Sequence, residues 1–302
     1  MLTNNASSYL DQLNEVQRQA VVHTEGPALV VAGPGSGKTR VLTYRIAYLI
    51  EQGAAPWEVL ALTFTNKAAR EMKERIEQVV GPRAKRVWAG TFHSLFARIL
   101  RNEAEHIGYT RNFTIYDSDD TKSLIGVLIK EMNLNREVYT VNSVRQRISS
   151  AKSNLITPKL YQQNEELMNQ DRMTRMPHLH KLYMAYTQRC KQAGAMDFDD
   201  LLYRLYELFQ SKEEVLAKYR RQFRYVLVDE FQDTNHLQYA IVRKLVSYPG
   251  SPRNICVVGD DAQSIYAFRG ATIQNILDFE NDFQQYGIQT FKLEQNYRST
   301  EH

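Results

Sequence analysis

The chain has 302 residues, 43% of them apolar and 24% charged, and it carries a formal net charge of +4. This length and composition are typical of a globular protein with roughly two domains. The longest apolar runs are far too short to cross a bilayer, and the first 11 residues lack the basic-then-apolar order of a secretory signal. The composition therefore excludes a membrane partner and predicts a cytoplasmic location. The mild basic excess permits a polyanionic partner without identifying one.

The first predicted element is a helix over residues 11–21, whose apolar residues recur at helical spacing. Asn14 is its candidate N-cap, because an Asn side chain accepts hydrogen bonds from the free N–H groups of a first helical turn. Gln17 has two interpretations. It is a solvated side chain, or its two-sided amide recognises the donor and acceptor edge of adenine.

A buried apolar strand is predicted over residues 28–32, followed by a glycine-rich loop and a helix over 39–51. This order is typical of a phosphate-binding P-loop, in which glycines turn backbone N–H groups around a polyphosphate at a helix N-terminus. Lys38 would reach the β- and γ-phosphates, and the Thr39 hydroxyl would be a Mg²⁺ ligand. An ordinary glycine-rich turn is the alternative. The candidate nucleotide-binding residues of this segment are Ala32, Gly33, Pro34, Gly35, Ser36, Gly37, Lys38, Thr39 and Arg40, with Ala32 standing where the strict pattern has Gly.

Two more strands, predicted over residues 59–65 and 86–89, are each followed by a helix. Such alternation indicates a parallel sheet with crossover helices, in which ligands bind beyond the carboxyl ends of the strands. Small polar residues and one ring lie at these ends, and they suit a phosphodiester backbone with a stacked base; helix capping is the alternative. These candidates are Phe64, Thr65, Asn66, Thr91 and His93.

From about residue 111 the pattern becomes helical, with helices predicted over 117–132, 141–153 and 165–191 and no strand between them. We interpret this region as a helical insertion in the α/β domain. Its Lys and Arg residues are either a surface that follows phosphates or a solvated helix face. The predicted organisation is residues 1–110 and 196–302 as two segments of one domain, with 111–195 inserted between them.

The α/β pattern resumes with an acidic helix start at residues 197–200, which suits the helix dipole, and a strand over 223–228 that ends in Asp229 and Glu230. Asp229 would hold Mg²⁺ opposite Thr39, and Glu230 would deprotonate a water for attack on the γ-phosphate. The alternative is an acidic turn after a strand.

A further strand over residues 254–258 ends in polar residues, and a last strand is predicted over 290–293. Gln263 would sense the γ-phosphate, because a neutral amide can donate to it. Tyr266 and Phe268 are candidate platforms for unstacked bases and Arg269 a candidate phosphate contact; core packing is the alternative for the two rings. The two cysteines, Cys190 and Cys256, fit no metal-binding spacing and are expected to be reduced core residues.

Taken in order, these segments resemble the UvrD/PcrA/Rep family of superfamily 1 DNA helicases. The resembling blocks are residues 13–17, 32–40, 62–75, 90–94, 197–201, 228–234, 259–270 and 293–300. The resemblance implies an α/β, RecA-like P-loop NTPase domain with a parallel sheet flanked by helices, interrupted by a mostly helical inserted subdomain. It also implies ATP and Mg²⁺ as cofactors, movement 3′→5′ on single-stranded DNA, and action at junctions of single-stranded and duplex DNA.

By the same resemblance, Gln17 would contact adenine, Tyr297 would stack on it, and Arg298 would be an arginine finger. Bases of single-stranded DNA would pass Phe64, Tyr266 and Phe268, with Thr65, Thr91 and His93 on phosphates. The sequence departs from the family at Phe268, where members usually have Trp, and at Ala262, where many have an acidic residue.

The family continues into a second RecA-like domain, so we expect this chain to be the N-terminal part of a longer helicase that does not unwind DNA by itself. The helicase subunit of a helicase–nuclease and a DNA-binding module without turnover are the alternatives. A small-molecule kinase is disfavoured, because Glu230 and Gln263 suit activation of water.

Overall fold

The computed structural model describes residues 9–33, 35–260 and 272–293, which fold into two compact units. The sheet unit consists of Met1–Leu95, Leu216–Thr234 and Val242–His302, and the helical unit of Phe96–Val215 and Asn235–Ile241. Among the described residues, no helix is both long and apolar enough to span a bilayer. The predicted domain boundaries at 110/111 and 195/196 stay predictions.

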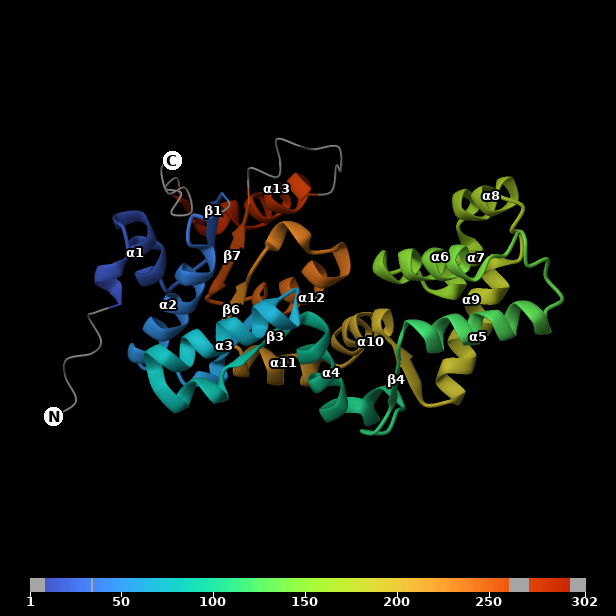
Figure 1. The fold of residues 1–302 in the computed structure, drawn as a ribbon, viewed down its shortest axis with the longest axis horizontal. Coiled ribbons are helices and arrows are strands. Elements are labelled where there is room, and N and C mark those ends of the chain that lie inside the picture. The colour runs from blue at the N-terminus through green and yellow to red at the C-terminus, as the bar shows by residue number, and fades with distance from the viewer. Residues whose placement is uncertain (1–8, 34, 261–271, 294–302) are drawn as a thin grey trace, which may run out of the picture. The chain divides into compact units, whose positions relative to one another are not determined.

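The sheet unit is built on six parallel strands in the order β3-β2-β6-β7-β1-β8, with helices flanking the sheet (Figure 1). The RecA-like α/β prediction is confirmed. Because the central strands are covered on both faces, they are continuous apolar runs. The strands are β1 (Ala28–Ala32), β2 (Val59–Thr63), β3 (Trp88–Thr91), β6 (Tyr225–Val228), β7 (Ile255–Gly259) and β8 (Gln289–Leu293).

Strand β3 differs from its prediction over residues 86–89. A 3-10 turn occupies Gly81–Arg86, so the strand begins two residues later, at Trp88. Proline at the second position of this turn favours the helical conformation there. As a result Thr91, one of the candidate DNA-contacting residues, is the last residue of the strand.

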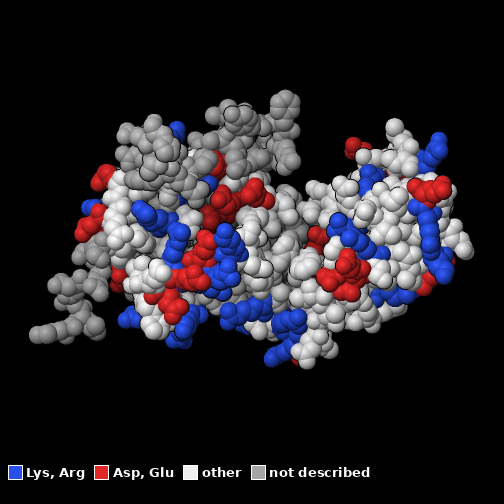
Figure 2. Space-filling view, viewed as in Figure 1, with Lys and Arg blue, Asp and Glu red and all other residues white. Residues whose placement is uncertain are grey.

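Side-chain caps fix where the helices of the sheet unit begin. Asn14 accepts the N–H of Gln17 (2.8 Å) and starts α1, as predicted, and Thr65 accepts the N–H of Ala68 (3.1 Å) and starts α3. The helices are α1 (Glu15–Val22), α2 (Lys38–Glu51), α3 (Asn66–Val80) and α13 (Thr272–Phe283), while α4 (Phe92–Glu103), α11 (Glu213–Gln222) and α12 (His236–Val246) have residues in both units. Figure 2 shows both charge signs interspersed over α3, typical of a solvated face.

The helical unit contains α5 (Ser118–Glu131), α6 (Val141–Ser153), α7 (Pro158–Gln163), α8 (Glu165–Met173), α9 (Leu179–Gln192) and α10 (Phe198–Ser211). The stretch predicted as mostly helical over 165–191 consists of two helices, α8 and α9. A two-stranded parallel sheet of β4 (Thr114–Tyr116) and β5 (Ala195–Asp197) was not predicted. Three-residue strands are too short to show a period, and their pairing joins distant parts of the chain.

A buried ion cluster fixes α6 to the start of α10. Lys152 Nζ lies 2.7 Å from Asp197 Oδ2 and 2.9 Å from Asp200 Oδ1, and the Tyr186 hydroxyl donates to Asp197 Oδ2 (2.7 Å). Burial alone would lower the pKa of Lys152, but the two carboxylates raise it above its ordinary value. The acidic helix start predicted at residues 197–200 is therefore present, and it also holds a buried cation.

Candidate functional site

The loop between β1 and α2 is a tight turn held by its own backbone. Gly35 and Gly37 have φ of +80° and +91°, a region that residues with a Cβ rarely adopt. Ser36 is 2% exposed, and both its N–H (3.3 Å) and its hydroxyl (2.7 Å) donate to the carbonyl of Gly33. Helix α2 then starts at Lys38, with Thr39 half-buried and Arg40 exposed in the first turn. The strand–loop–helix order of a phosphate site is present.

Lys38 lies between two carboxylates from the neighbouring strands β6 and β7. Its Nζ is 3.2 Å from Glu230 Oε2 and 3.2 Å from Asp260 Oδ2, and the Asp260 side chain is only 2% exposed. The predicted lysine and base therefore converge at the carboxyl edge of the sheet. Asp260 was missed by the sequence analysis, although its position at the end of a buried strand was the available signal.

Asp229 is the last residue before Glu230 and is almost fully buried. Burial, and then the charge of Glu230, raise the pKa of Asp229 to about 6. Its N–H donates to Leu62 O on β2 (2.9 Å), and one carboxylate oxygen accepts the N–H of Glu230 (3.0 Å). A buried carboxyl group with a pKa of about 6 binds a hard divalent cation readily, because the charge of the cation offsets the free-energy cost of burying the ionised carboxylate.

Glu230 has a left-handed backbone, with φ of +47° and ψ of +48°. Such a conformation is uncommon for a residue with a long side chain and is often found at active sites. Gln232, which is 4% exposed, donates through Nε2 to Glu230 Oε2 (2.7 Å) and accepts the N–H of Asp260 on Oε1 (3.1 Å). Gln232 was also missed. Its side chain ties the predicted base to the end of β7.

Gln17 lies beside the glycine-rich loop and is fully buried. Its Nε2 donates to Ser36 O (2.9 Å) and its Oε1 accepts the N–H of Asn14 (3.1 Å). The solvated interpretation is therefore wrong. The adenine contact stays a prediction.

Candidate DNA-contacting residues gather at the carboxyl ends of β2 and β3. The Phe64 ring is half-buried on Phe92, with ring centroids 5.3 Å apart, and Thr65 and Asn66 are exposed. Thr91 is mostly buried, and its hydroxyl accepts the N–H of Ser94 (3.2 Å). The capping predicted as the alternative is thus present for Thr65 and Thr91, and their DNA contacts stay predictions. His93 is half-buried in the first turn of α4.

Several predicted site residues lie outside the described part of the chain, and their roles stay predictions. They are Pro34, Ala262, Gln263, Tyr266, Phe268, Arg269, Tyr297 and Arg298.

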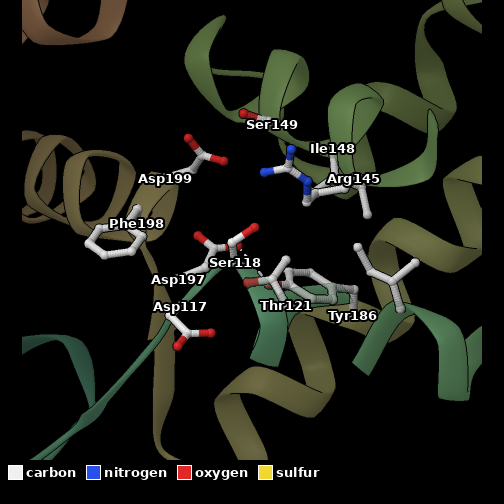
Figure 3. A pocket seen from close by; sticks show the side chains of 11 residues that line it. Asp117, Ser118, Thr121, Arg145, Ile148, Ser149, Tyr186, Asp197, Phe198 and Asp199 are labelled. Carbon is white, nitrogen blue, oxygen red and sulfur yellow. Dashed lines mark hydrogen bonds between the residues drawn. The ribbon is translucent and has the colours of Figure 1, made fainter. Parts of the chain in front are cut away.

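The helical unit has a separate pocket of about 70 Å³, with Arg145 opposite Asp199 (Figure 3). Two of its other carboxylates serve as helix caps. Asp117 accepts the N–H groups of Asp119 (2.8 Å) and Asp120 (2.9 Å), which lower its pKa, and Asp197 belongs to the buried ion cluster. Helix capping and the ion cluster explain Asp117 and Asp197, and no residue predicted for the nucleotide site lines this pocket.

Comparison of the sequence with known proteins identifies its family. Residues 13–284 match the UvrD/REP helicase N-terminal domain. The chain is 47% identical over 302 residues to the ATP-dependent DNA helicase UvrD1 of Mycobacterium tuberculosis (strain ATCC 25618 / H37Rv), covering 98% of this chain and 38% of that protein. It is also 47% identical over 296 residues to the ATP-dependent DNA helicase PcrA of Bacillus subtilis (strain 168), covering 98% of this chain and 39% of that protein. The chain thus spans less than two-fifths of these relatives, and it belongs to the UvrD/REP helicase N-terminal domain family.

Proposed function

We propose that the sheet unit binds ATP with Mg²⁺ and hydrolyses it, as part of a DNA helicase that moves 3′→5′ on single-stranded DNA and opens junctions with duplex DNA. The observation that carries the proposal is the convergence of Lys38 with Glu230 and Asp260 beside a glycine-rich loop. The two relatives, which are named ATP-dependent DNA helicases, support it. The polarity rests on family resemblance.

In this mechanism the loop N–H groups and Lys38 bind the triphosphate. The ammonium group already lies among carboxylates, so phosphate oxygens can replace them as its anionic partners. Mg²⁺ would neutralise phosphate charge, held by the Thr39 hydroxyl and the Asp229 carboxylate. Two protein oxygens suit Mg²⁺, which usually keeps several waters and takes phosphate oxygens as ligands.

Glu230 acts as the general base. Its left-handed backbone and the Gln232 hydrogen bond fix its carboxylate at the carboxyl edge of the sheet. Once Lys38 turns to the phosphates, the Glu230 carboxylate is able to accept a proton from the attacking water. The hydrolysis products are ADP and inorganic phosphate.

Single-stranded DNA lies across the carboxyl ends of β2 and β3 in this proposal. The half-exposed Phe64 ring provides a face on which a base can stack. Thr65, Asn66 and His93 provide neutral donors and acceptors for phosphate oxygens, which position a strand without reading its sequence.

The Lys38→Ala substitution tests the proposal. We expect it to weaken Mg·ATP binding at least tenfold, because a charge-assisted contact contributes about 1.5–3 kcal/mol. Lys85→Ala, an exposed lysine change in the same unit and outside every candidate site, is the control and should leave the affinity unchanged. The measurement is calorimetric titration with ATP. Equal affinities of wild-type protein and Lys38→Ala would contradict the proposed site.

A further inference from the structure

The turn that follows Glu230 carries the side chain that holds this carboxylate. Gln232 lies in the middle of the 3-10 turn Phe231–Asp233. Its side-chain amide donates to Glu230 Oε2 (2.7 Å) and accepts the N–H of Asp260, just after β7 (3.1 Å). A single 3-10 turn has few hydrogen bonds of its own, and their geometry is poorer than in an α-helix. The orientation of the Glu230 carboxylate therefore depends on the contacts that fix this turn from outside.

Asn275 of α13 fixes the turn through its backbone. The residue is half-buried, and its Nδ2 donates to Thr234 O (2.6 Å) and to Gln232 O (3.3 Å). An amide nitrogen carries two hydrogens, so one side chain can satisfy both carbonyls. The second bond holds the backbone of the same residue whose side chain contacts Glu230. Asn275 is thus linked to the proposed base through one intervening residue.

Apolar packing holds α13 against the turn independently of this amide. The rings of Phe279 and Phe231 are both fully buried, with centroids 5.4 Å apart. Ile276 lies close to β7, where a Cβ at Gly259 would be 3.2 Å from Ile276 Cδ1. Apolar burial is non-directional, whereas a hydrogen bond requires a defined geometry. The distinct contribution of Asn275 is therefore to the orientation of the turn.

We propose that Asn275 is a positioning residue for ATP hydrolysis, acting through the backbone of Gln232 on the Glu230 carboxylate. This inference rests on the proposed function and extends it to α13, a helix to which no role in hydrolysis has been assigned. Asn275 contributes to the rate of the chemical step and does not contribute to ATP affinity.

The experiment measures single-turnover hydrolysis of Mg·ATP and the affinity for ATP in wild-type protein, Asn275→Ala and Gln274→Ala. We expect Asn275→Ala to lower the hydrolysis rate roughly three- to tenfold, as for a lost hydrogen bond, with ATP affinity unchanged. Gln274 is exposed on the same helix and donates to Asp278 Oδ1 (2.7 Å), so Gln274→Ala is the matched control and should change neither quantity. Asn275→Asp keeps the size of the side chain but lacks its donor hydrogens, so it should lower the rate at least as much.

Two further variants separate positioning of the base from docking of the helix. In Glu230→Gln the proposed base is absent, so adding Asn275→Ala should cause no further loss of rate. Phe279→Leu weakens the packing of α13 on Phe231 and keeps the Asn275 amide. It should lower resistance to urea and leave the hydrolysis rate of the folded protein unchanged.

An unchanged hydrolysis rate in Asn275→Ala would overturn the inference. An equal loss of rate in Phe279→Leu would overturn it as well, because docking of α13 would then explain the effect. Loss of ATP binding in both Asn275 variants, or a further loss of rate in the Glu230→Gln background, would assign Asn275 to folding or to another route. If wild-type protein hydrolysed no ATP, the proposed function itself would fail, which is a different result from a failure at Asn275.

Discussion

At the scale of single residues, Glu230 combines a strained backbone with a carboxylate shared by Lys38 and Gln232. Glu230→Gln keeps the shape and removes the proton acceptor. We expect single-turnover ATP hydrolysis to fall by about 10²–10⁴-fold, the usual worth of a general base, while ATP binding stays within a few-fold. Rapid-quench assays with a parallel binding titration provide the measurement. Normal hydrolysis by this variant would show that another group accepts the proton.

Asp229 gives the molecule a defined pH dependence. Its pKa is raised to about 6, mainly by burial, so the folded state holds a proton there that the unfolded state has lost. The stability from this group is complete below about pH 4, falls as pH rises toward 6 and stays low above it. Asp229→Asn should remove this decline and raise the free energy of unfolding at pH 7.5 by on the order of 2 kcal/mol without Mg²⁺.

Urea unfolding at pH 4.5 and 7.5 in the presence of a chelator measures this effect. The gain in stability of the Asn variant should be much larger at pH 7.5 than at pH 4.5. In the proposed site Mg²⁺ is held by the ionised form of this carboxylate, so the metal affinity of the wild-type protein should rise as pH passes through 6. A variant that is no more stable than wild type at pH 7.5 would contradict the raised pKa.

Phe64 and Trp57 flank the two ends of the same strand, β2, which makes them a matched pair of partly exposed aromatic residues. Phe64→Ala should weaken binding of oligo-dT by roughly 1–3 kcal/mol if a base stacks on the ring. Trp57→Ala lies at the amino end of the strand and should leave binding unchanged. Fluorescence anisotropy measures both. An equal loss in the two variants would argue against a specific stacking site.

At the scale of elements, the α6–α10 connection depends on one buried cation. Lys152→Met removes the cation that is bonded to both Asp197 and Asp200. Although the charge of Arg204 still acts on Asp200, we expect a loss of about 3–5 kcal/mol in the free energy of unfolding. Lys122→Met, which removes an exposed pair with Asp119 (3.6 Å), is the control and should change stability by less than about 1 kcal/mol. Urea denaturation of both variants measures the difference. A small loss of stability in Lys152→Met would mean that Asp197 and Asp200 become protonated at little cost in free energy.

The elements that could be predicted are those with a local signal. An apolar run such as β1, a cap such as Asn14, and the glycine-rich turn before Lys38 are each determined within a few residues. The pairing of β4 with β5, and the contacts of Gln232 and Asp260 with Glu230 and Lys38, were missed. They depend on which strands become neighbours, and that order is a property of the whole sheet.

At the scale of the whole molecule, the sheet order places both proposed activities at one edge. Strand β6 carries Asp229 and Glu230, and it pairs with β7 on one side and β2 on the other. The sequence predicted a common edge, because all strands were expected to be parallel. It did not predict that the acidic strand lies directly beside the strand that leads to Phe64.

This adjacency has a mechanical consequence. The N–H of Asp229 donates to Leu62 O, two residues before Phe64, so one hydrogen bond joins the backbone of the proposed metal ligand to the strand that leads to the aromatic ring. A shift of the Asp229 backbone when phosphate departs would pull on β2 through that bond. The proposed ATP hydrolysis and DNA binding would then be coupled through one backbone hydrogen bond, without a long chain of intervening residues.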